Sequence, residues 1–210
     1  MVDPPNAIAR IQQVKGRVAY DIGGNVGEVA TILSSNFQLV YSFEPAKESL
    51  ARLKELSKQK TNIIPIGMAV TENPGEIDLI VASSSIKKGQ LVSGNYLENW
   101  GKQIGVRRVP ATSIDEFSKD HYPPDFIKID VEGHELNVIK GGLNTIRGFL
   151  PRLYIEVHLD LFGVDIRELL SSIYDFDIIP HPAYSKDSPR RKNHYFMFAI
   201  PKLQAHNKLV

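Results

Sequence analysis

The sequence predicts an α/β fold, a doubly wound and mainly parallel sheet of seven strands. Apolar segments of strand length alternate with segments of helical periodicity along most of the chain, and a glycine-rich turn joins the first strand to the helix after it. Such alternation is typical of a parallel sheet covered by helices on both faces. A C-terminal antiparallel strand pair and a short N-terminal helix complete the expected fold.

The elements of the first half follow from apolar spacing and from glycine and proline positions. Pro45 ends the second strand because proline has no N–H group to donate to a strand ladder. The next helix carries Leu50, Leu53 and Leu56 on one face. The expected segments are a helix over 7–14, a strand over 17–22, a helix carrying Val26, Ala30, Leu33 and Phe37, a strand over 38–43, a helix over 46–56 and a strand over 62–70.

The second half contains a long polar stretch, 83–105, between two short extra strands. A stretch of this length is a lid, a substrate-binding element or a disordered loop, and the sequence leaves these interpretations open. The expected segments are strands over 76–82 and 107–110, a helix over 113–117, a strand over 125–131, a helix over 134–140 with a further turn to 147, a strand over 152–157, a helix over 165–174 and strands over 176–179 and 194–200. We therefore expect a tail and helix at 1–16 and one domain at 17–210.

The bulk composition is that of an ordinary globular protein. The chain has 210 residues, 42% of them hydrophobic and 23% charged, and a net charge of +1 that gives no overall attraction to polyanions. It has no cysteine, which excludes disulfides and thiolate chemistry. The N-terminus lacks a basic leader with an apolar segment, and no apolar run reaches the ~18 residues of a membrane helix. We expect a cytoplasmic protein without membrane association.

The turn Asp21-Ile22-Gly23-Gly24-Asn25-Val26-Gly27 is the strongest functional signal. Glycines between a strand and a helix allow close approach of the backbone to a ligand, although such a turn also occurs as plain structural punctuation. The acid precedes the glycines, whereas a dinucleotide site places its acid about 20 residues later. A carboxylate at Asp21 would repel a pyrophosphate and would suit a ligand with an ammonium group. The turn therefore favours S-adenosylmethionine over NAD.

Acids recur where the other strands end, which is where doubly wound sheets bind ligands. Glu44 is expected to accept hydrogen bonds from ribose hydroxyls; the alternative is a carboxylate at the start of the next helix. Lys128, Asp130 and Glu132 share a strand face, and all three are expected to point toward the cofactor's methionine part or the substrate. The alternative there is an internal Lys–Asp pair, with Glu132 or Glu135 at the next helix start.

Histidines supply the candidates for proton transfer. His158 is the better general-base candidate because the pKa of free histidine lies near 6.5. His134 is expected to be an exposed residue at a helix start. Glu156 and His158, with Asp130 and Glu132, also present oxygen ligands of the kind Mg²⁺ prefers, but hydrogen bonding is the favoured interpretation and we expect no bound metal.

The final quarter of the chain is basic, with a cluster at Pro189-Arg190-Arg191-Lys192. This cluster is either a contact for an anionic substrate or RNA, or a solvated loop between two strands, and the solvated loop is preferred.

Several motifs together resemble the FkbM family of S-adenosylmethionine-dependent methyltransferases. They extend over roughly 18–158, and the block at 127–135 is the most specific. The motifs are Asp21-Ile22-Gly23-Gly24-Asn25-Val26-Gly27, Phe43-Glu44-Pro45, Ser113-Ile114-Asp115-Glu116-Phe117, Ile127-Lys128-Ile129-Asp130-Val131-Glu132-Gly133-His134-Glu135, Val138-Ile139-Lys140-Gly141-Gly142 and Tyr154-Ile155-Glu156-Val157-His158.

The resemblance implies a Rossmann-like class I methyltransferase sheet with S-adenosylmethionine as methyl donor. It implies Asp130 near the methionine end of the cofactor, and a small change at Gly24, where family members often have alanine. The cofactor-binding candidates are Asp21, Gly23, Gly24, Asn25, Gly27, Glu44, Pro45, Met68, Ala69 and Asp130, and the catalytic candidates are Asp130, His158 and Glu132.

The expected function is methyl transfer to a hydroxyl of a sugar or small natural product. The alternatives are an RNA methyltransferase and a non-catalytic S-adenosylmethionine-binding module, with an NAD oxidoreductase further behind. The sequence does not set the acceptor or the oligomeric state, and a homodimer is compatible with it.

Overall fold

The main sheet has seven strands in the order β10-β11-β9-β8-β1-β2-β3. We describe a computed structural model, for residues 5–82, 89–91, 103–158, 160–181 and 194–202. All neighbouring strands are parallel except at β11, which runs antiparallel to both β9 and β10. The strands are β1 (Gly16–Ile22), β2 (Phe37–Phe43), β3 (Ile63–Ile66), β8 (Phe126–Ile129), β9 (Arg152–Val157), β10 (Tyr174–Pro180) and β11 (Tyr195–Pro201). The predicted doubly wound sheet with its C-terminal antiparallel pair is confirmed.

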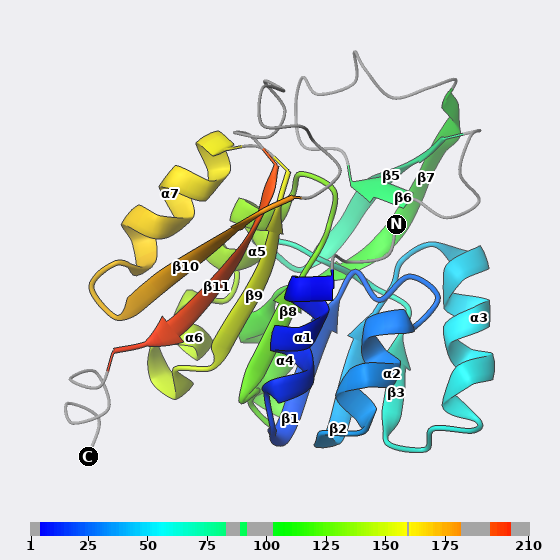
Figure 1. The fold of residues 1–210 in the computed structure, drawn as a ribbon. Helices are drawn as coiled ribbons and strands as arrows, with labels where there is room; N and C mark the ends of the chain where they lie inside the picture. Colours follow the sequence, from blue (N-terminus) through cyan, green and yellow to red (C-terminus); the bar gives the residue numbers. More distant parts are fainter. Residues whose placement is uncertain (1–4, 83–88, 92–102, 159, 182–193, 203–210) are drawn as a thin grey trace.

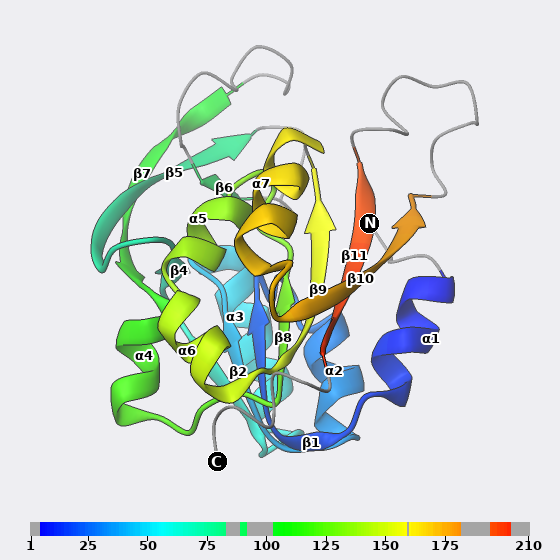
Figure 2. The same cartoon turned by 90° about the vertical axis from the view of Figure 1, so that its left-hand side faces the viewer.

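Helices cover both faces of this sheet, as Figure 2 shows. Residues of α1 to α3 share one buried cluster with alternate strand residues such as Val40 and Phe126, and residues of α4 to α7 share another with Tyr20 and Ile155. Alternation of side chains along each strand supplies both cores. The helices are α1 (Pro5–Gln13), α2 (Glu28–Ser34), α3 (Lys47–Ser57), α4 (Ile114–Asp120), α5 (Glu135–Lys140), α6 (Leu143–Phe149) and α7 (Asp160–Leu170).

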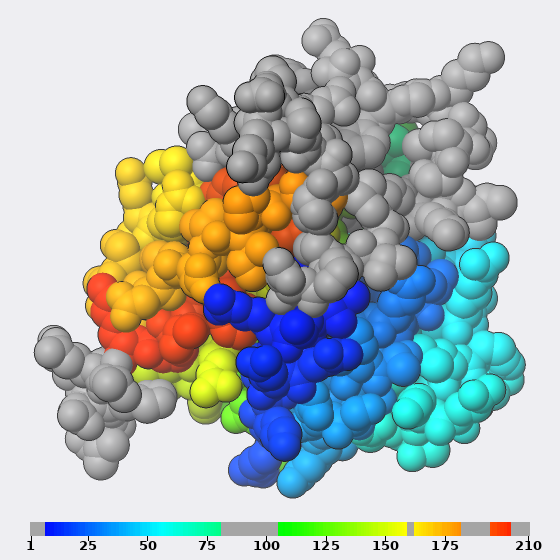
Figure 3. Space-filling model, viewed as in Figure 1, coloured from blue at the N-terminus to red at the C-terminus, as the bar shows by residue number. Residues whose placement is uncertain are grey.

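The N-terminal helix α1 belongs to the same core as the sheet. Ala7 and Ile11 are fully buried, and Arg10 forms an ion pair with Asp177 of β10. Figure 3 shows α1 packed beside α2 on this face, with β10 and β11 on its other side. The helix therefore covers the part of the sheet where the C-terminal strands join it.

A second, four-stranded sheet in the order β4-β7-β5-β6 extends beyond the carboxyl ends of the main strands (Figure 1). Its strands are β4 (Ala69–Val70), β5 (Gly75–Ala82), β6 (Gly89–Leu91) and β7 (Gln103–Thr112). The expected extra strands are thus present and antiparallel, but β7 is longer than predicted. The prediction of an irregular stretch over 83–105 is wrong at 89–91 and from 103 onward, and its remaining residues lie outside the described ranges.

The single strand predicted over 62–70 is wrong, because it is two strands in two sheets. β3 pairs with β2, whereas Ala69 and Val70 pair with β7. Gly67 stands at the break, where an added Cβ would lie 2.8 Å from Leu50 Cδ2. Apolar residues on both sides of the break gave the segment one continuous strand-like pattern.

The helix predicted over 165–174 is α7, which both begins and ends earlier in the sequence, at Asp160–Leu170. Tyr174 instead opens β10, where its side chain is buried and its hydroxyl donates to Pro151 O at 2.6 Å. Phe37, expected on the helix after the turn, likewise opens β2. Among the described residues, no helix is long and apolar enough to cross a membrane.

Candidate active site

The turn between β1 and α2 alternates left-handed residues. Gly23, Asn25 and Gly27 have φ angles of 80°, 47° and 93°. A side chain at Gly23 would place its Cβ 1.8 Å from Asp130 O, so only glycine allows the turn to pack against the end of β8. The glycine turn and the 130–135 segment therefore lie in direct contact at the carboxyl edge of the sheet.

Asp21 lies beneath this turn and is fully buried. Its Oδ2 accepts a hydrogen bond from the Ser42 hydroxyl at 2.7 Å, and its Oδ1 lies 3.3 Å from Lys128 Nζ. The sequence interpretation did not foresee this pairing of Asp21 with Lys128; the alternative it offered was a pair between Lys128 and Asp130, whose charged atoms lie 3.7 Å apart. Because Lys128 neutralises its charge, Asp21 does not select between an ammonium group and a pyrophosphate in the way the sequence suggested. Its role in cofactor binding stays a prediction.

Lys128 connects the glycine turn with the 130–135 segment. Its Nζ donates to Gly23 O at 2.6 Å and lies 3.7 Å from Asp130 Oδ2, while the side chain is 3% exposed. The expectation that Lys128 faces a ligand is wrong: it is an internal tie between β8 and the glycine turn.

Gly24 packs closely against β2. An added Cβ would lie 2.1 Å from Ser42 Oγ and 3.1 Å from Asp21 Oδ2. Alanine at this position is therefore not the small change that the family pattern implied. Moving the Ser42 hydroxyl away would break its hydrogen bond to Asp21.

We expect Gly24→Ala to lower the free energy of unfolding by about 1–3 kcal/mol through overpacking. In a Ser42→Ala background, which removes the obstructing oxygen, the same change is expected to cost less than half as much. Urea unfolding of the two single variants and the double variant measures this coupling. An equal loss of unfolding free energy in both backgrounds would contradict a close contact between residue 24 and the Ser42 hydroxyl.

Glu44, directly after β2, ties the glycine turn to α3. Its Oε2 accepts from Asn25 N at 2.8 Å and its Oε1 from Ala46 N at 2.7 Å. Ala46 is the residue that caps α3, so the helix-start interpretation describes part of its role. Burial raises the pKa of Glu44 to about 7, although both backbone hydrogen bonds act to lower it. Contact with a ribose stays a prediction.

The segment after β8 makes a tight left-handed turn. Glu132 and Gly133 have φ angles of 56° and 102°, and Gly133 N donates to Glu135 Oε1 at 2.8 Å. A non-glycine residue in this region is strained and is often found at a functional site. The turn leaves the Asp130 side chain 29% exposed and the Glu132 side chain 14% exposed.

His158, after β9, lies among carboxylates. Its Nδ1 is 2.9 Å from Glu135 Oε1, and its Nε2 is 3.4 Å from Glu132 Oε2. The same Nε2 is 3.7 Å from Glu156 Oε1 and 4.0 Å from Asp130 Oδ1. The structure thus brings together all three catalytic candidates, Asp130, Glu132 and His158.

The charge state of His158 follows from this cluster. Burial lowers its pKa, but Glu135, Glu132 and Glu156 together outweigh burial and raise it to about 10. Burial and then Asp130 raise the pKa of Glu156 to about 8. At neutral pH the His158 ring is therefore protonated, with both nitrogens facing carboxylates, and lacks the free lone pair of a general base.

His134 is buried, so the expectation that it is exposed is wrong. It is 2% exposed, its Nε2 lies 2.7 Å from Thr71 Oγ1, and burial lowers its pKa to about 4. The second sheet, which supplies Thr71 next to β4, covers this helix start. Sequence alone gave no indication of that cover.

The remaining cofactor candidates lie along the same edge. Pro45 is half-buried between β2 and α3, Met68 is half-buried between β3 and β4, and Ala69 is buried in β4. The sequence interpretation gave no role to Ser42, whose hydroxyl donates to Asp21, or to His181 and His194, which lie close to Glu156. Ser42 precedes Glu44 by two positions and so points to the same side of β2, which was the available signal.

The strand order and the turn at the end of β1 define a Rossmann-like methyltransferase fold. The same architecture occurs in the FkbM methyltransferase from Methylobacillus flagellatus KT, with a TM-score of 0.62 and 21% identity over 94% of this chain and 48% of that chain. It also occurs in an rRNA methylase from Streptococcus thermophilus, with a TM-score of 0.55 and 11% identity over 96% of this chain and 98% of that chain.

The family is defined by sequence as well. Residues 21–178 match the methyltransferase FkbM domain, so the chain belongs to the FkbM methyltransferase family. A curated relative, the hexuronic acid methyltransferase AglP of Haloferax volcanii, is 29% identical over 155 residues. That match covers 73% of this chain and 61% of AglP, so this chain spans less than two thirds of its relative.

Proposed function

We propose that this chain transfers the methyl group of S-adenosylmethionine to a hydroxyl oxygen of a sugar. Membership of the FkbM methyltransferase family supports the reaction class. The observation that carries the proposal is the convergence of the glycine turn, Glu44 and the partly exposed Asp130 at one edge of the sheet. AglP, which acts on a hexuronic acid, supports a sugar acceptor.

In this proposal, different residues bind the cofactor and the acceptor. Gly23 to Gly27 and Glu44 hold the adenosine part, while Met68 and Ala69 lie beside it. Asp130, the most exposed carboxylate of the His158 cluster, faces the methionine end and the acceptor. S-adenosylmethionine supplies an electrophilic methyl group bonded to a sulfonium.

The step conserves atoms and charge. With S-adenosylmethionine bound, a bond from the acceptor oxygen to the methyl carbon would replace the carbon–sulfur bond, S-adenosylhomocysteine would be released, and Asp130 would accept the hydroxyl proton. Holding oxygen, carbon and sulfur in line contributes up to ~7–11 kcal/mol in favourable systems. His158 positions Asp130, which lies between its ring and Lys128, and Glu132, and it does not itself take the proton.

The test has two stages. Calorimetry with S-adenosylmethionine, S-adenosylhomocysteine and NAD is expected to give binding for the first two only. Methyl transfer is then measured with a neutral hexoside and a matched hexuronide as acceptors. Binding without transfer to any sugar would favour the cofactor-binding module, and binding of NAD alone would overturn the proposal.

An RNA acceptor stays the second hypothesis. The basic cluster 189–192 on which it depended lies outside the described residues, and likeness to an rRNA methylase at 11% identity concerns the fold alone. RNA binding that falls steeply with added salt would favour this hypothesis over a sugar.

We expect the affinity for S-adenosylmethionine to weaken as pH falls below about 7. Ribose hydroxyls donate to a carboxylate, and the pKa of Glu44 in the free protein is about 7. Binding at lower pH must therefore release the Glu44 proton, at a cost of up to about tenfold in affinity per pH unit. Dissociation constants measured from pH 5.5 to 8.5 check this expectation.

The matched control is Glu44→Gln, which keeps the size of the side chain but does not titrate. Its affinity is expected to be lower at pH 8 and free of the additional slope below pH 7. An identical slope in both proteins would show that another group causes the pH dependence.

A further inference from the structure

Three neighbouring strands bring two histidines and a glutamate together at the sheet edge. His181 directly follows β10, His194 directly precedes β11, and Glu156 belongs to β9. Pro180 pairs with Tyr195, so His181 and His194 are the next opposed positions of the same antiparallel ladder. Glu156 pairs with Phe196, which is two residues from His194 and shares its face.

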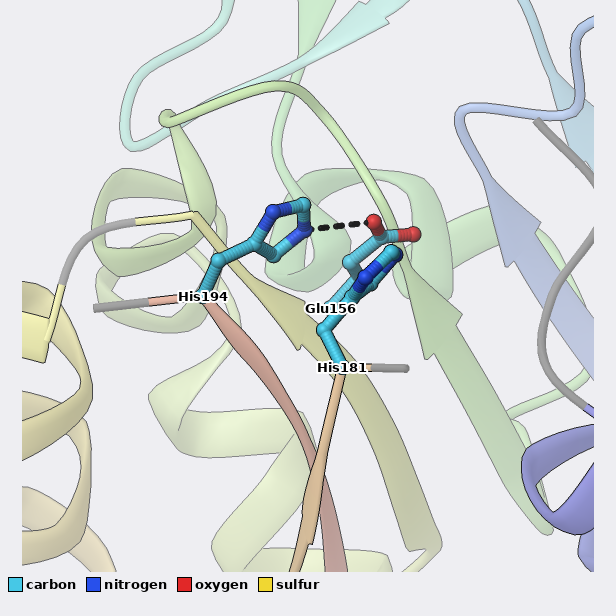
Figure 4. Close-up of side chains that lie close together, drawn as sticks. All are labelled: Glu156, His181 and His194. Atoms are coloured by element: carbon cyan, nitrogen blue, oxygen red, sulfur yellow. Dashed lines mark hydrogen bonds and ion pairs between the residues drawn. The ribbon is translucent and has the colours of Figure 1, made fainter. Parts of the chain in front are cut away.

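The side chains of this triad, Glu156, His181 and His194, converge, as Figure 4 shows. One ligand atom from each lies within 4.8 Å of the other two. His194 Nε2 is 2.7 Å from Glu156 Oε1, and the His181 and His194 rings stack with centroids 4.3 Å apart. All three residues are at least nine-tenths buried, at 8%, 4% and 9% exposure.

We propose that Glu156, His181 and His194 form a binding site for a divalent transition-metal ion, with Zn²⁺ as the preferred ion. Two imidazoles and one carboxylate are an established ligand set for catalytic zinc and for non-haem iron. Mg²⁺ and Ca²⁺ prefer sites made of oxygen ligands, and two imidazoles select against them. Zn²⁺ lies above Mn²⁺, Fe²⁺ and Co²⁺ in general affinity for such sites.

The separation of the His194 and Glu156 ligand atoms is close to the one that a bound ion requires. Ligand atoms bonded at ~2.0–2.1 Å to a tetrahedral ion are about 3.3 Å apart. The His194–Glu156 distance of 2.7 Å would therefore open by a few tenths of an ångström as the ion replaces the proton between them. The His181 ring stacks on Phe196 with centroids 5.2 Å apart, and this contact holds the ring beside His194.

A second group, Asp130, Glu156 and His158, also has ligand atoms within 4.8 Å of one another. It contains three of the four residues of the Mg²⁺ hypothesis from the sequence, without Glu132, and it shares Glu156 with the triad. It contains one imidazole, and its Asp130 is 29% exposed. The triad is the stronger site because it has a second nitrogen ligand and buries all of its ligands.

Three protein ligands leave one position of a tetrahedral ion for an oxygen ligand. Glu156 Oε1 lies 3.7 Å from His158 Nε2, so the triad adjoins the cluster around Asp130. The ion would sit at the border between the strand pair β10–β11 and the candidate acceptor site. The metal site does not depend on the proposed methyl transfer, because ion binding is measurable without any substrate.

Zinc binding by the untagged full chain tests this proposal. After treatment with a chelator, the protein is expected to bind one Zn²⁺ per chain in competition with a chromogenic chelator. Co²⁺ is expected to bind at the same site with visible absorption of a low-coordinate ion. Zn²⁺ is also expected to raise the unfolding temperature, whereas Mg²⁺ is not.

His181→Ala and His194→Ala are each expected to weaken Zn²⁺ binding by more than about 100-fold, since removing even an outer partner of a metal ligand costs 10–100-fold. His121→Gln is the matched control; this histidine ends α4 and contacts Phe117, outside the triad. Its affinity is expected to equal that of the original chain.

Absence of one-to-one Zn²⁺ uptake by the unaltered chain would overturn the proposal, whatever the variants do. So would equal affinity in His181→Ala, or loss of affinity in His121→Gln to the same extent. Methyl transfer that fails while Zn²⁺ binds at this triad would contradict the proposed function and leave the metal site standing.

Discussion

Lys128→Met is expected to lower the free energy of unfolding by about 3–5 kcal/mol, because it leaves buried charge without its partner. Lys128 is 3% exposed and lies between Asp21, which is fully buried, and Asp130. Its hydrogen bond to Gly23 O is lost as well. For a chain of this size the unfolding temperature should fall by roughly 6–20 °C. Urea and thermal unfolding check both values.

The double variant Asp21→Asn with Lys128→Met separates charge from packing. The asparagine amide oxygen still accepts from Ser42 but carries no charge, so at least half of the lost stability is expected to return. Lys119→Met is the surface control: it breaks the exposed pair with Glu116 and should leave the urea midpoint unchanged. A Lys128→Met protein as stable as this control would show that the buried contacts of Lys128 do not stabilise the fold.

Asp130→Asn is expected to lower kcat by about 10²–10⁴-fold, the usual contribution of a positioned general base. The dissociation constant for S-adenosylmethionine should change by only a few-fold, because the adenosine contacts at Glu44 and the glycine turn remain. Single-turnover methyl transfer and calorimetry measure the two quantities separately.

This separation decides between the two roles predicted for Asp130. A large loss of cofactor affinity with an unchanged rate at saturation would make it a cofactor ligand and not the base. Glu132→Gln tests the neighbouring carboxylate, which is 14% exposed, and is expected to have the smaller effect. Asp78→Asn, on the exposed surface of β5, is the control for a change of charge alone.

Part of the candidate site could be predicted because it depends on residues close in sequence. The glycines of the turn require left-handed backbone, and a turn between a strand and a helix at the carboxyl edge of a parallel sheet is a ligand position. The placement of Glu44 after β2, of Asp130 after β8 and of Glu156 near the end of β9 follows from the same strand pattern. Their nearness to one another follows from the parallel sheet.

The partners of each charge could not be predicted, because they depend on contacts between distant strands. Asp21 forms an ion pair with Lys128, which lies 107 residues later in the sequence. His158 forms a hydrogen bond with Glu135, which lies 23 residues earlier. The pKa of His158, raised to about 10 against the effect of burial, depends on Glu135, Glu132 and Glu156, which come from the segment after β8 and from β9. The histidine that the sequence offered as a free base is therefore charged and surrounded by carboxylates.

The sequence by itself determined the layered fold, the glycine turn and the family, because periodicity and turn chemistry are local properties. The tertiary structure alone decided which carboxylates are compensated, that His134 is covered by a second sheet, and that His181 and His194 meet Glu156. These outcomes depend on strand register and on the path of β4 into the second sheet, since a side chain's charge state and partners are set by what packs against it and not by its neighbours in the chain.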